Sequence, residues 1–462
     1  MQARSPFGLD ALRGDLGALA DSSVRRGSWG MMVVSLSHGD TLFAVNADVP
    51  YVPASTQKLL TSVLALESLG PAYRYQTDVL HTGTLSDGRI DGDLILRGDG
   101  DPSLSTRFVG RTPDVVMDSI AARVARAGVR EVTGRVIGDA SAFESRSIPA
   151  GWNPRILQDS YAGRVSGLSL NDNLVWLTIR PSVRGQPADV FLEPATSTIP
   201  LRSSLKTVAG SRAKLRYTRI NGVITVSGTI GVDAAPRSYV YVVEDPASFT
   251  TGAFLAALGR QGIKVAGGLA MARTPSDAQP LTMWKSAPLE TLLTVMNRES
   301  VNLIAEHVYR AAARGADRRA TGSALTADTA LRALVQRAAG VAGGAVQSTD
   351  GSGLSQLDKV SPRALVQLLG WADRAAWSSL FHASLPLAGE SGTMRRRMSG
   401  TSAQTNLHAK TGTMNDVLAL AGYVTARNGE LLAFALMYNG PEIYRARETT
   451  DAIGVTLANW AR

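Results

Sequence analysis

The chain has 462 residues, about three times the usual size of one compact domain, which predicts two or three domains. Its net charge of +9 comes mostly from scattered arginines, so a nucleic-acid partner is not expected, and no stretch approaches the roughly 20 apolar residues of a transmembrane segment. Cysteine is absent and the 5 histidines lack ligand spacing, which excludes disulfides and thiol chemistry and predicts neither a metal nor another cofactor.

The first third of the chain predicts a helix, a hairpin and a second helix. Leucines recur at helical spacing over residues 9–20, and two short apolar runs, 30–36 and 41–45, flank a turn. The second helix begins near Ser55 and ends at Gly70. No apolar signal segment is visible in residues 1–10, which leaves a cytoplasmic protein or one whose signal has been removed.

The middle of the chain, about residues 75–270, is rich in short β-like runs separated by Gly, Asp and Pro turns. Strands are predicted at 93–96, 132–137, 175–179, 223–226 and 239–243, and helices at 114–127 and 248–261.

Helical periodicity dominates again after residue 289. Helices are predicted at 289–314, 324–339 and 362–375, followed by a hairpin of strands 417–424 and 431–438 and a C-terminal helix. The order predicts an α+β protein, in which an antiparallel sheet built from both chain ends is flanked by helices and interrupted by a β-rich insertion.

A Ser-x-x-Lys pattern places Ser55 and Lys58 on one face of the first turn of a helix. A serine hydroxyl needs a base to take its proton, and a desolvated lysine amine can serve as that base. The same pattern at Ser203 and at Ser211 lies in the insertion, where nothing fixes the pair on one face, so those residues are interpreted as solvated surface.

Two further short motifs carry hydroxyl, amide and amine groups. Ser300 and Asn302 fall inside the predicted helix 289–314, where both residue types are mildly unfavourable. Lys410, Thr411 and Gly412 precede the C-terminal hairpin, so they are expected on a strand bordering the same sheet. A polar helix face and an exposed strand lysine are the plain alternatives for each motif taken alone.

Together, in this order, the three motifs resemble those of β-lactamases and penicillin-binding proteins. The long interval between Ser55 and Ser300 narrows the resemblance to the D-alanyl-D-alanine carboxypeptidase/endopeptidase family, the low-molecular-mass class C penicillin-binding proteins. Other stretches that match in family order are 96–102, 138–143, 350–354, 384–389 and 408–413. The resemblance implies a catalytic domain of residues 1–73 and 284–462, a first inserted domain of 74–164 and 250–283, and a second of 165–249.

The resemblance also implies a mechanism and its partners. Ser55 would attack the penultimate D-alanine of peptidoglycan stem peptides with Lys58 as base, and Ser300, Asn302 and Lys410 would complete the catalytic set. Lys410, Thr411 and Thr413 would hold the terminal carboxylate, and Gly412 would let the substrate backbone approach closely. Backbone N–H groups of Ser55 and Thr413 would hold the oxyanion. Neither a metal nor a cofactor is implied, β-lactams would acylate Ser55, and the location would be periplasmic or otherwise outside the cytoplasm.

Two departures from the family pattern stand out. Asp99 replaces a usual glycine, which is interpreted as a harmless loop change. Relatives place an acidic residue shortly before an aromatic one to bind the free amino end of the stem peptide, and here Tyr161 matches the aromatic while Ile156 stands at the acidic position. Either Asp159 substitutes for that acidic group, or the preferred peptide differs.

Two alternatives stay open at this point. One is a β-lactamase or serine esterase on the same core, although no counterpart of the class A deacylating glutamate is found. The other is a peptidoglycan-binding protein without catalysis.

Overall fold

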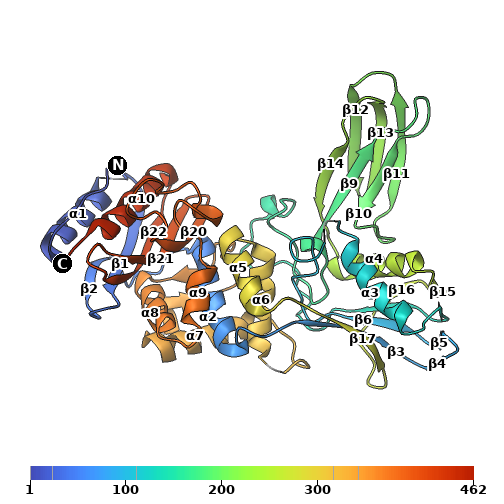
Figure 1. Cartoon of the computed structure of the whole chain (residues 1–462), viewed down its shortest axis with the longest axis horizontal. Helices are drawn as coiled ribbons and strands as arrows, with labels where there is room; N and C mark the ends of the chain where they lie inside the picture. Colours follow the sequence, from blue (N-terminus) through green and yellow to red (C-terminus); the bar gives the residue numbers. More distant parts are fainter. Residues whose placement is uncertain (1, 23, 111, 316, 342) are drawn as a thin grey trace.

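The structure is a computed structural model that describes residues 2–22, 24–110, 112–315, 317–341 and 343–462. Figure 1 shows an elongated molecule with both termini at one end, helices in the middle and β-rich parts at the other end. One of those β-rich parts, which carries β9 to β14, projects away from the rest. The helices are α1 (Leu9–Asp21), α2 (Gln57–Leu69), α3 (Val115–Arg126), α4 (Pro246–Arg260), α5 (Leu289–Glu299), α6 (Asn302–Arg314), α7 (Ala324–Ala339), α8 (Pro362–Asp373), α9 (Ser378–Ser384) and α10 (Ile443–Asn459).

A five-stranded antiparallel sheet joins the two ends of the chain, in the order β2-β1-β22-β21-β20. Its strands are β1 (Ser28–Ser35), β2 (Thr41–Val45), β20 (His408–Met414), β21 (Val417–Thr425) and β22 (Leu431–Asn439). Both predicted hairpins are confirmed, and so is the placement of the Lys-Thr-Gly motif on a bordering strand, because β20 is an edge of this sheet.

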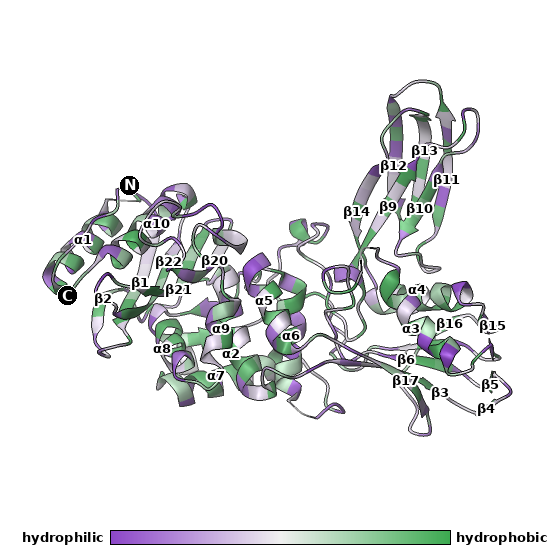
Figure 2. Cartoon of the chain, in the orientation of Figure 1, coloured by the Kyte–Doolittle hydropathy of each residue, from purple (hydrophilic) through white to green (hydrophobic). Residues whose placement is uncertain are grey.

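Alternating side chains give the sheet two different faces. On β22, Leu432, Phe434 and Leu436 pack in a cluster with α1 and α10, whereas Ala433 and Ala435 face a second cluster that holds α2 and α5 to α8. Figure 2 shows hydrophobic colour along these strands and on the covering helices. On the second face, α8 packs against β1, β21 and β22.

The predicted helix 289–314 is wrong as a single element, because the chain breaks at Ser300. Ser300 adopts φ 59 and ψ 40, in the left-handed region, and Val301 is extended, so α5 ends at Glu299 and α6 begins at Asn302. A non-glycine residue in this region is uncommon and is often found where function requires it. The break removes Ser300 from the helix and lets its side chain point elsewhere.

The insertion forms four sheets around one core. Their orders are β16-β8-β6-β3-β17, β15-β7-β5-β4, β10-β9-β14 and β11-β13-β12. The strands are β3 (Gln76–His81), β4 (Thr84–Ser86), β5 (Arg89–Asp91), β6 (Leu94–Arg97), β7 (Glu131–Val132), β8 (Val136–Asp139), β9 (Leu174–Arg180), β10 (Asp189–Glu193), β11 (Leu201–Val208), β12 (Ala213–Ile220), β13 (Val223–Gly231), β14 (Arg237–Val242), β15 (Lys264–Val265), β16 (Leu269–Met271) and β17 (Gln279–Lys285). Two short strands elsewhere, β18 (Val346–Gln347) and β19 (Lys359–Val360), pair with each other.

The α+β class with a β-rich insertion is confirmed, with one strand corrected. The predicted strand 132–137 is two strands, β7 and β8, which belong to different sheets. Buried residues between Val79 and Ile263 form a core of their own, separate from the clusters built by both chain ends. The domain boundaries at 73/74, 164/165, 249/250 and 283/284 stay predictions.

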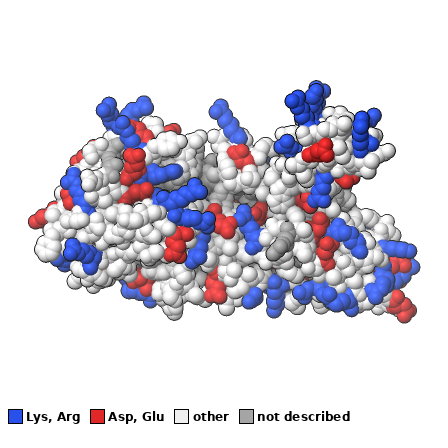
Figure 3. All heavy atoms as spheres, turned by 45° about the horizontal axis from the view of Figure 1, so that its top comes forward, with Lys and Arg blue, Asp and Glu red and all other residues white. Residues whose placement is uncertain are grey.

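No helix in the described part of the chain has the length and apolar character needed to span a bilayer. On the face drawn in Figure 3, acidic and basic side chains are interspersed, with one group of basic side chains on the lobe that carries α10.

Asp99 is a buried residue through which the insertion contacts α6. This corrects the interpretation of Asp99 as a harmless loop change. Its Oδ1 accepts a hydrogen bond from Arg314 Nη1 at 2.7 Å, both side chains are 3% exposed, and Arg318 Nε lies 3.3 Å from Oδ2. A buried carboxylate is tolerated only with such partners, and removing one partner of a buried pair leaves the other charge uncompensated.

We therefore predict that Asp99→Ala lowers the free energy of unfolding by about 3–5 kcal/mol, because Arg314 loses its buried counter-charge. Urea denaturation followed by circular dichroism measures this. The matched control is Asp91→Ala, which removes a pair with Arg89 whose Asp91 side chain is 61% exposed and which should cost less than about 1 kcal/mol. Equal losses in the two variants would contradict the structural role of Asp99.

Candidate active site

Ser55 lies in a 3-10 turn, η1 (Ala54–Thr56), that runs directly into α2. Ala54 has φ 45, and the Thr56 hydroxyl donates to the Pro53 carbonyl at 2.7 Å, which fixes the turn. Lys58 Nζ donates to Ser55 Oγ at 3.0 Å. The predicted Ser–Lys pair is therefore in hydrogen-bond contact, with the serine one turn before the regular helix.

The Lys58 amine is fully buried and has three hydrogen-bond acceptors. Besides Ser55 Oγ, these are Asn302 Oδ1 and the Ser352 carbonyl, each at 2.7 Å. Burial lowers the pKa of Lys58 from 10.5 to about 7, against the opposing effect of nearby carboxylates. An amine with this pKa is present in both protonation states near neutral pH, as a general base requires.

The break before α6 places Asn302 in contact with Lys58 and Ser300 in contact with Lys410. Asn302 bridges two segments, because its Oδ1 accepts from Lys58 and its Nδ2 donates to the Tyr161 carbonyl at 2.9 Å. Ser300 Oγ accepts a hydrogen bond from Lys410 Nζ at 2.8 Å. The second predicted motif thus contacts both other motifs.

Lys410 projects from the edge strand β20 into a fully buried position. Besides Ser300, its Nζ donates to the Thr411 carbonyl at 2.9 Å. Burial, together with the nearby charge of Lys58, lowers the pKa of Lys410 well below its usual value. Because the two amines disfavour each other's charged form, a proton on one lysine weakens the hold of the other on its own proton.

Glycine at 412 lets β20 pass close to the serine turn. A Cβ at this position would lie 2.8 Å from the Pro53 carbonyl oxygen and 3.1 Å from Ser55 N, closer than such contacts normally allow. The neighbouring Thr411 hydroxyl donates to Thr393 Oγ1 at 2.7 Å, and Thr413 is exposed. All three predicted residues of this strand border the space beside Ser55.

The loop 350–355 completes the surroundings of Lys58. Asp350 accepts hydrogen bonds from the N–H groups of Ser352, Gly353 and Ser355 at 2.9, 2.6 and 2.8 Å. Buried Glu306 accepts from the N–H groups of Gly351 and Ser352 at 3.0 and 2.9 Å. These bonds hold the Ser352 carbonyl against Lys58. From the sequence, this loop was identified only as a stretch that matches the family. Glu306 was missed, because nothing in the neighbouring sequence distinguishes a buried glutamate on a helix from an exposed one.

Asp159 and Tyr161 lie together, but they bond to each other. The Tyr161 hydroxyl donates to Asp159 Oδ2 at 2.7 Å, and this bond raises the pKa of Tyr161. Tyr161 and Ile156 line a cavity of about 470 Å³ that also contains Ser55, Ser300 and Asn302. Asp159 does not line that cavity, so its role toward a substrate stays a prediction.

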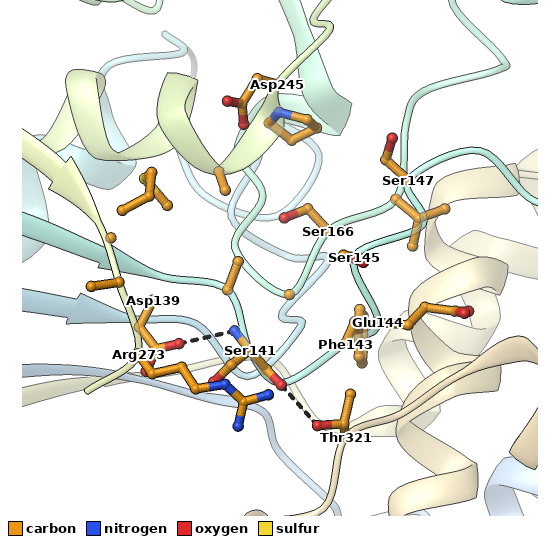
Figure 4. Close-up of a pocket in the computed structure, with 18 of the residues that line it drawn as sticks. Asp139, Ser141, Phe143, Glu144, Ser145, Ser147, Ser166, Asp245, Arg273 and Thr321 are labelled. Carbon is orange, nitrogen blue, oxygen red and sulfur yellow. Dashed lines mark hydrogen bonds between the residues drawn. The ribbon is translucent and has the colours of Figure 1, made fainter. Parts of the chain in front are cut away.

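A second cavity, of about 420 Å³, also borders Ser55, and its lining includes Thr393, Thr411 and Thr413. A larger cavity of about 550 Å³ lies away from the three motifs (Figure 4). That cavity is lined by serines and carboxylates of the insertion, but none of its described lining residues is a lysine that pairs with a serine. Of these three cavities, as lined by described residues, the two that contain Ser55 are the ones next to the Ser55–Lys58 pair.

The antiparallel sheet with helices on both faces, the serine at a helix start and the Lys-Thr-Gly edge strand define the penicillin-binding, β-lactamase-like class of proteins. The sequence profile of the D-Ala-D-Ala carboxypeptidase 3 (S13) family matches residues 15–460. The chain belongs to this family and is a hydrolase of the D-Ala-D-Ala carboxypeptidase type, as the three motifs had indicated.

Relatives agree along nearly the whole chain. A D-alanyl-D-alanine carboxypeptidase of Actinomadura sp. (strain R39) is 33% identical over 473 aligned positions, covering 98% of this chain and 85% of that protein. A D-alanyl-D-alanine carboxypeptidase of Haemophilus influenzae is 24% identical, covering 89% and 85%. The crystal structure of penicillin binding protein 4 from Haemophilus influenzae superposes with a TM-score of 0.78, 22% identity and coverage of 94% and 98%.

Gly353, in the loop 350–355, lies directly against the serine turn. A Cβ there would lie 1.8 Å from the Ala54 carbonyl oxygen, so Gly353→Ala should push the loop away from Lys58. A displacement of about 1 Å can cost on the order of 100-fold in rate, and we expect a loss of that size in acylation by a fluorescent penicillin.

The matched control for this variant is Gly262→Ala. Gly262 has φ +77, close to the φ +78 of Gly353, but a Cβ there meets no described atom within 4 Å. Both variants should suffer the same backbone strain of about 1–2 kcal/mol, while only the first should lose acylation. Equal acylation rates would contradict the proposed support of Lys58 by the loop.

Proposed function

We propose that the protein is a serine-type D-alanyl-D-alanine carboxypeptidase and endopeptidase that cleaves peptidoglycan stem peptides through an acyl-enzyme on Ser55. The observation that carries this proposal is the 3.0 Å hydrogen bond between Ser55 Oγ and a buried Lys58 whose pKa is about 7. A neutral amine beside the hydroxyl is what converts a weak nucleophile into an effective one.

In the first step Lys58 accepts the Ser55 proton while Oγ attacks the carbonyl carbon of the penultimate D-alanine. The resulting oxyanion lies between the backbone N–H groups of Ser55 and Thr413, and each such donor is typically worth roughly 3 kcal/mol in the transition state. The amide C–N bond then breaks, and the leaving amine takes a proton through Ser300, which is hydrogen-bonded to Lys410. Water subsequently hydrolyses the ester on Ser55.

Asn302 positions the base in this scheme. Its Oδ1 holds Lys58, and one of its two amide hydrogens is used by the Tyr161 carbonyl, which leaves the other for a substrate carbonyl. Thr411 and Thr413 offer hydroxyl groups to the terminal carboxylate of the substrate. Gly412 keeps the strand close enough to Ser55 for both contacts.

β-Lactams are the expected covalent inhibitors, because they present a strained amide to the same serine. A penicillin binding protein 4 of Haemophilus influenzae, similar in fold, has been crystallised with a β-lactam. A periplasmic or extracytoplasmic location follows from the proposed substrate. Rapid turnover of a chromogenic cephalosporin would favour a β-lactamase or esterase instead, and peptidoglycan binding without acylation would favour a non-catalytic role.

Intact-mass spectrometry with a fluorescent penicillin tests the nucleophile. We expect a stable adduct on the wild type and on Ser203→Ala, and none on Ser55→Ala. Ser203 is the matched control, because it also starts a Ser-x-x-Lys pattern but is exposed on β11. An adduct on Ser55→Ala, or no adduct on a folded wild type, would contradict the proposal.

The pH dependence of acylation tests Lys58. Because only the neutral amine can accept the Ser55 proton, the acylation rate should rise with pH through the Lys58 pKa of about 7 and level off above it. Stopped-flow measurement of acylation from pH 5 to 9 follows this. Lys58→Arg, which stays protonated throughout, should lower the rate by at least about 100-fold and remove the rise. A flat wild-type profile would exclude Lys58 as the base.

A further inference from the structure

Ser55 lies where two separate cavities meet. Ser55, Ser300 and Thr413 line both the cavity of about 470 Å³ and the cavity of about 420 Å³. A peptide whose scissile carbonyl is placed on Ser55 therefore extends its acyl part into one cavity and its leaving part into the other.

The two cavities differ in charge. Among the described residues, no charged side chain lines the first cavity, whose walls include Ile156, Tyr161 and Leu354. Arg396, Arg397 and Arg447 line the second, and none of its described lining residues is a carboxylate. The substrate is thus presented with a neutral surface on one side of Ser55 and a strongly basic one on the other.

Two of the three arginines have guanidinium groups without a partner in the described part of the chain. Arg397 is bound to Asp451 at 2.8 Å and to Thr450. Arg396, in the loop after η5 (Gly392–Met394), and Arg447, on α10, are exposed, and their guanidinium groups have no hydrogen bond or ion pair with any described residue. Exposed guanidinium groups that form no ion pair within the protein are available for an anionic ligand.

The second cavity is the leaving-group side. It contains the hydroxyl groups of Thr393, Thr411 and Thr413, and Lys410 lies behind it against Ser300. These are the groups suited to the carboxylate next to the scissile amide and to protonation of the departing amine. The arginines extend this side beyond the position of that first carboxylate.

We infer that Arg396 and Arg447 form a subsite for a second anionic group on the leaving part of the substrate. A single D-alanine has only one carboxylate, which the threonine hydroxyls can bind. A leaving peptide strand with a further carboxylate would use both sets of groups, so the subsite favours cleavage of cross-linked peptides over removal of one terminal residue. This inference rests on the proposed function, since it assumes that Ser55 is the nucleophile.

Synthetic peptides with a constant acyl part and a variable leaving residue test the subsite. The leaving residue is D-glutamate, which adds one carboxylate, or D-glutamine, which has nearly the same shape without the charge. We expect kcat/KM for the wild type to favour D-glutamate about fivefold, the upper range for an exposed ion pair. The ratio should fall toward one in the Arg396→Gln/Arg447→Gln double variant and in high salt.

The matched control is Arg395→Gln/Arg445→Gln. Arg395 and Arg445 belong to the same two segments, and their replacement removes the same charge. Because neither residue lines the cavity, the D-glutamate preference should persist. A ratio of one in the wild type, or an equal loss in both double variants, would overturn the subsite. A penicillin adduct on Ser55 accompanied by a flat ratio would overturn only the subsite, whereas no adduct and no turnover in the wild type would overturn the proposed function with it.

Discussion

The burial of two lysine amines within one site is the constraint on which the rest of the structure depends. An ammonium group removed from water costs several kcal/mol unless acceptors surround it, and Lys58 and Lys410 are both fully buried. Lys58 is held by Ser55, Asn302 and the Ser352 carbonyl, while Lys410 has Ser300 and the carbonyl of the next residue. Burial, together with the charge of Lys58, lowers the pKa of Lys410, so the two amines disfavour being charged at the same time.

The insertion takes part in holding the Lys58 amine. Trp152 Nε1 donates to Asp350 Oδ2 at 2.7 Å, and Asp350 organises the loop whose Ser352 carbonyl binds Lys58. The Tyr161 carbonyl accepts from Asn302, the other partner of Lys58. Both contacts involve the segment between the first two motifs, so the insertion helps to position Lys58. A catalytic core without the insertion would lose these two contacts.

The sequence was sufficient for features that depend on neighbouring residues. Ser55 and Lys58 were predictable because their spacing and helix context are local, and Lys410 because a strong hairpin follows it. The left-handed Ser300 was not, since helical periodicity continues through α5 and α6 and only tertiary contacts impose the break; the unfavourable serine in a helix was the one signal. Strands β11 and β12 escaped prediction because most of their side chains are exposed, which weakens the alternation of apolar residues.

The difference in charge between the two cavities at Ser55 could not be predicted from the sequence for a different reason. Three segments far apart in the chain, the loop after η5, α10 and β20, contribute to it together. Ser300 and the threonine hydroxyl groups of β20 already favour one direction of the peptide, because they lie on the side proposed for the leaving amine and its carboxylate. The neutral cavity and the arginines add to that preference, because a peptide placed in reverse would desolvate its carboxylate against neutral walls without a partner. Orientation of the substrate thus depends on the electrostatic field around the nucleophile as well as on the catalytic motifs.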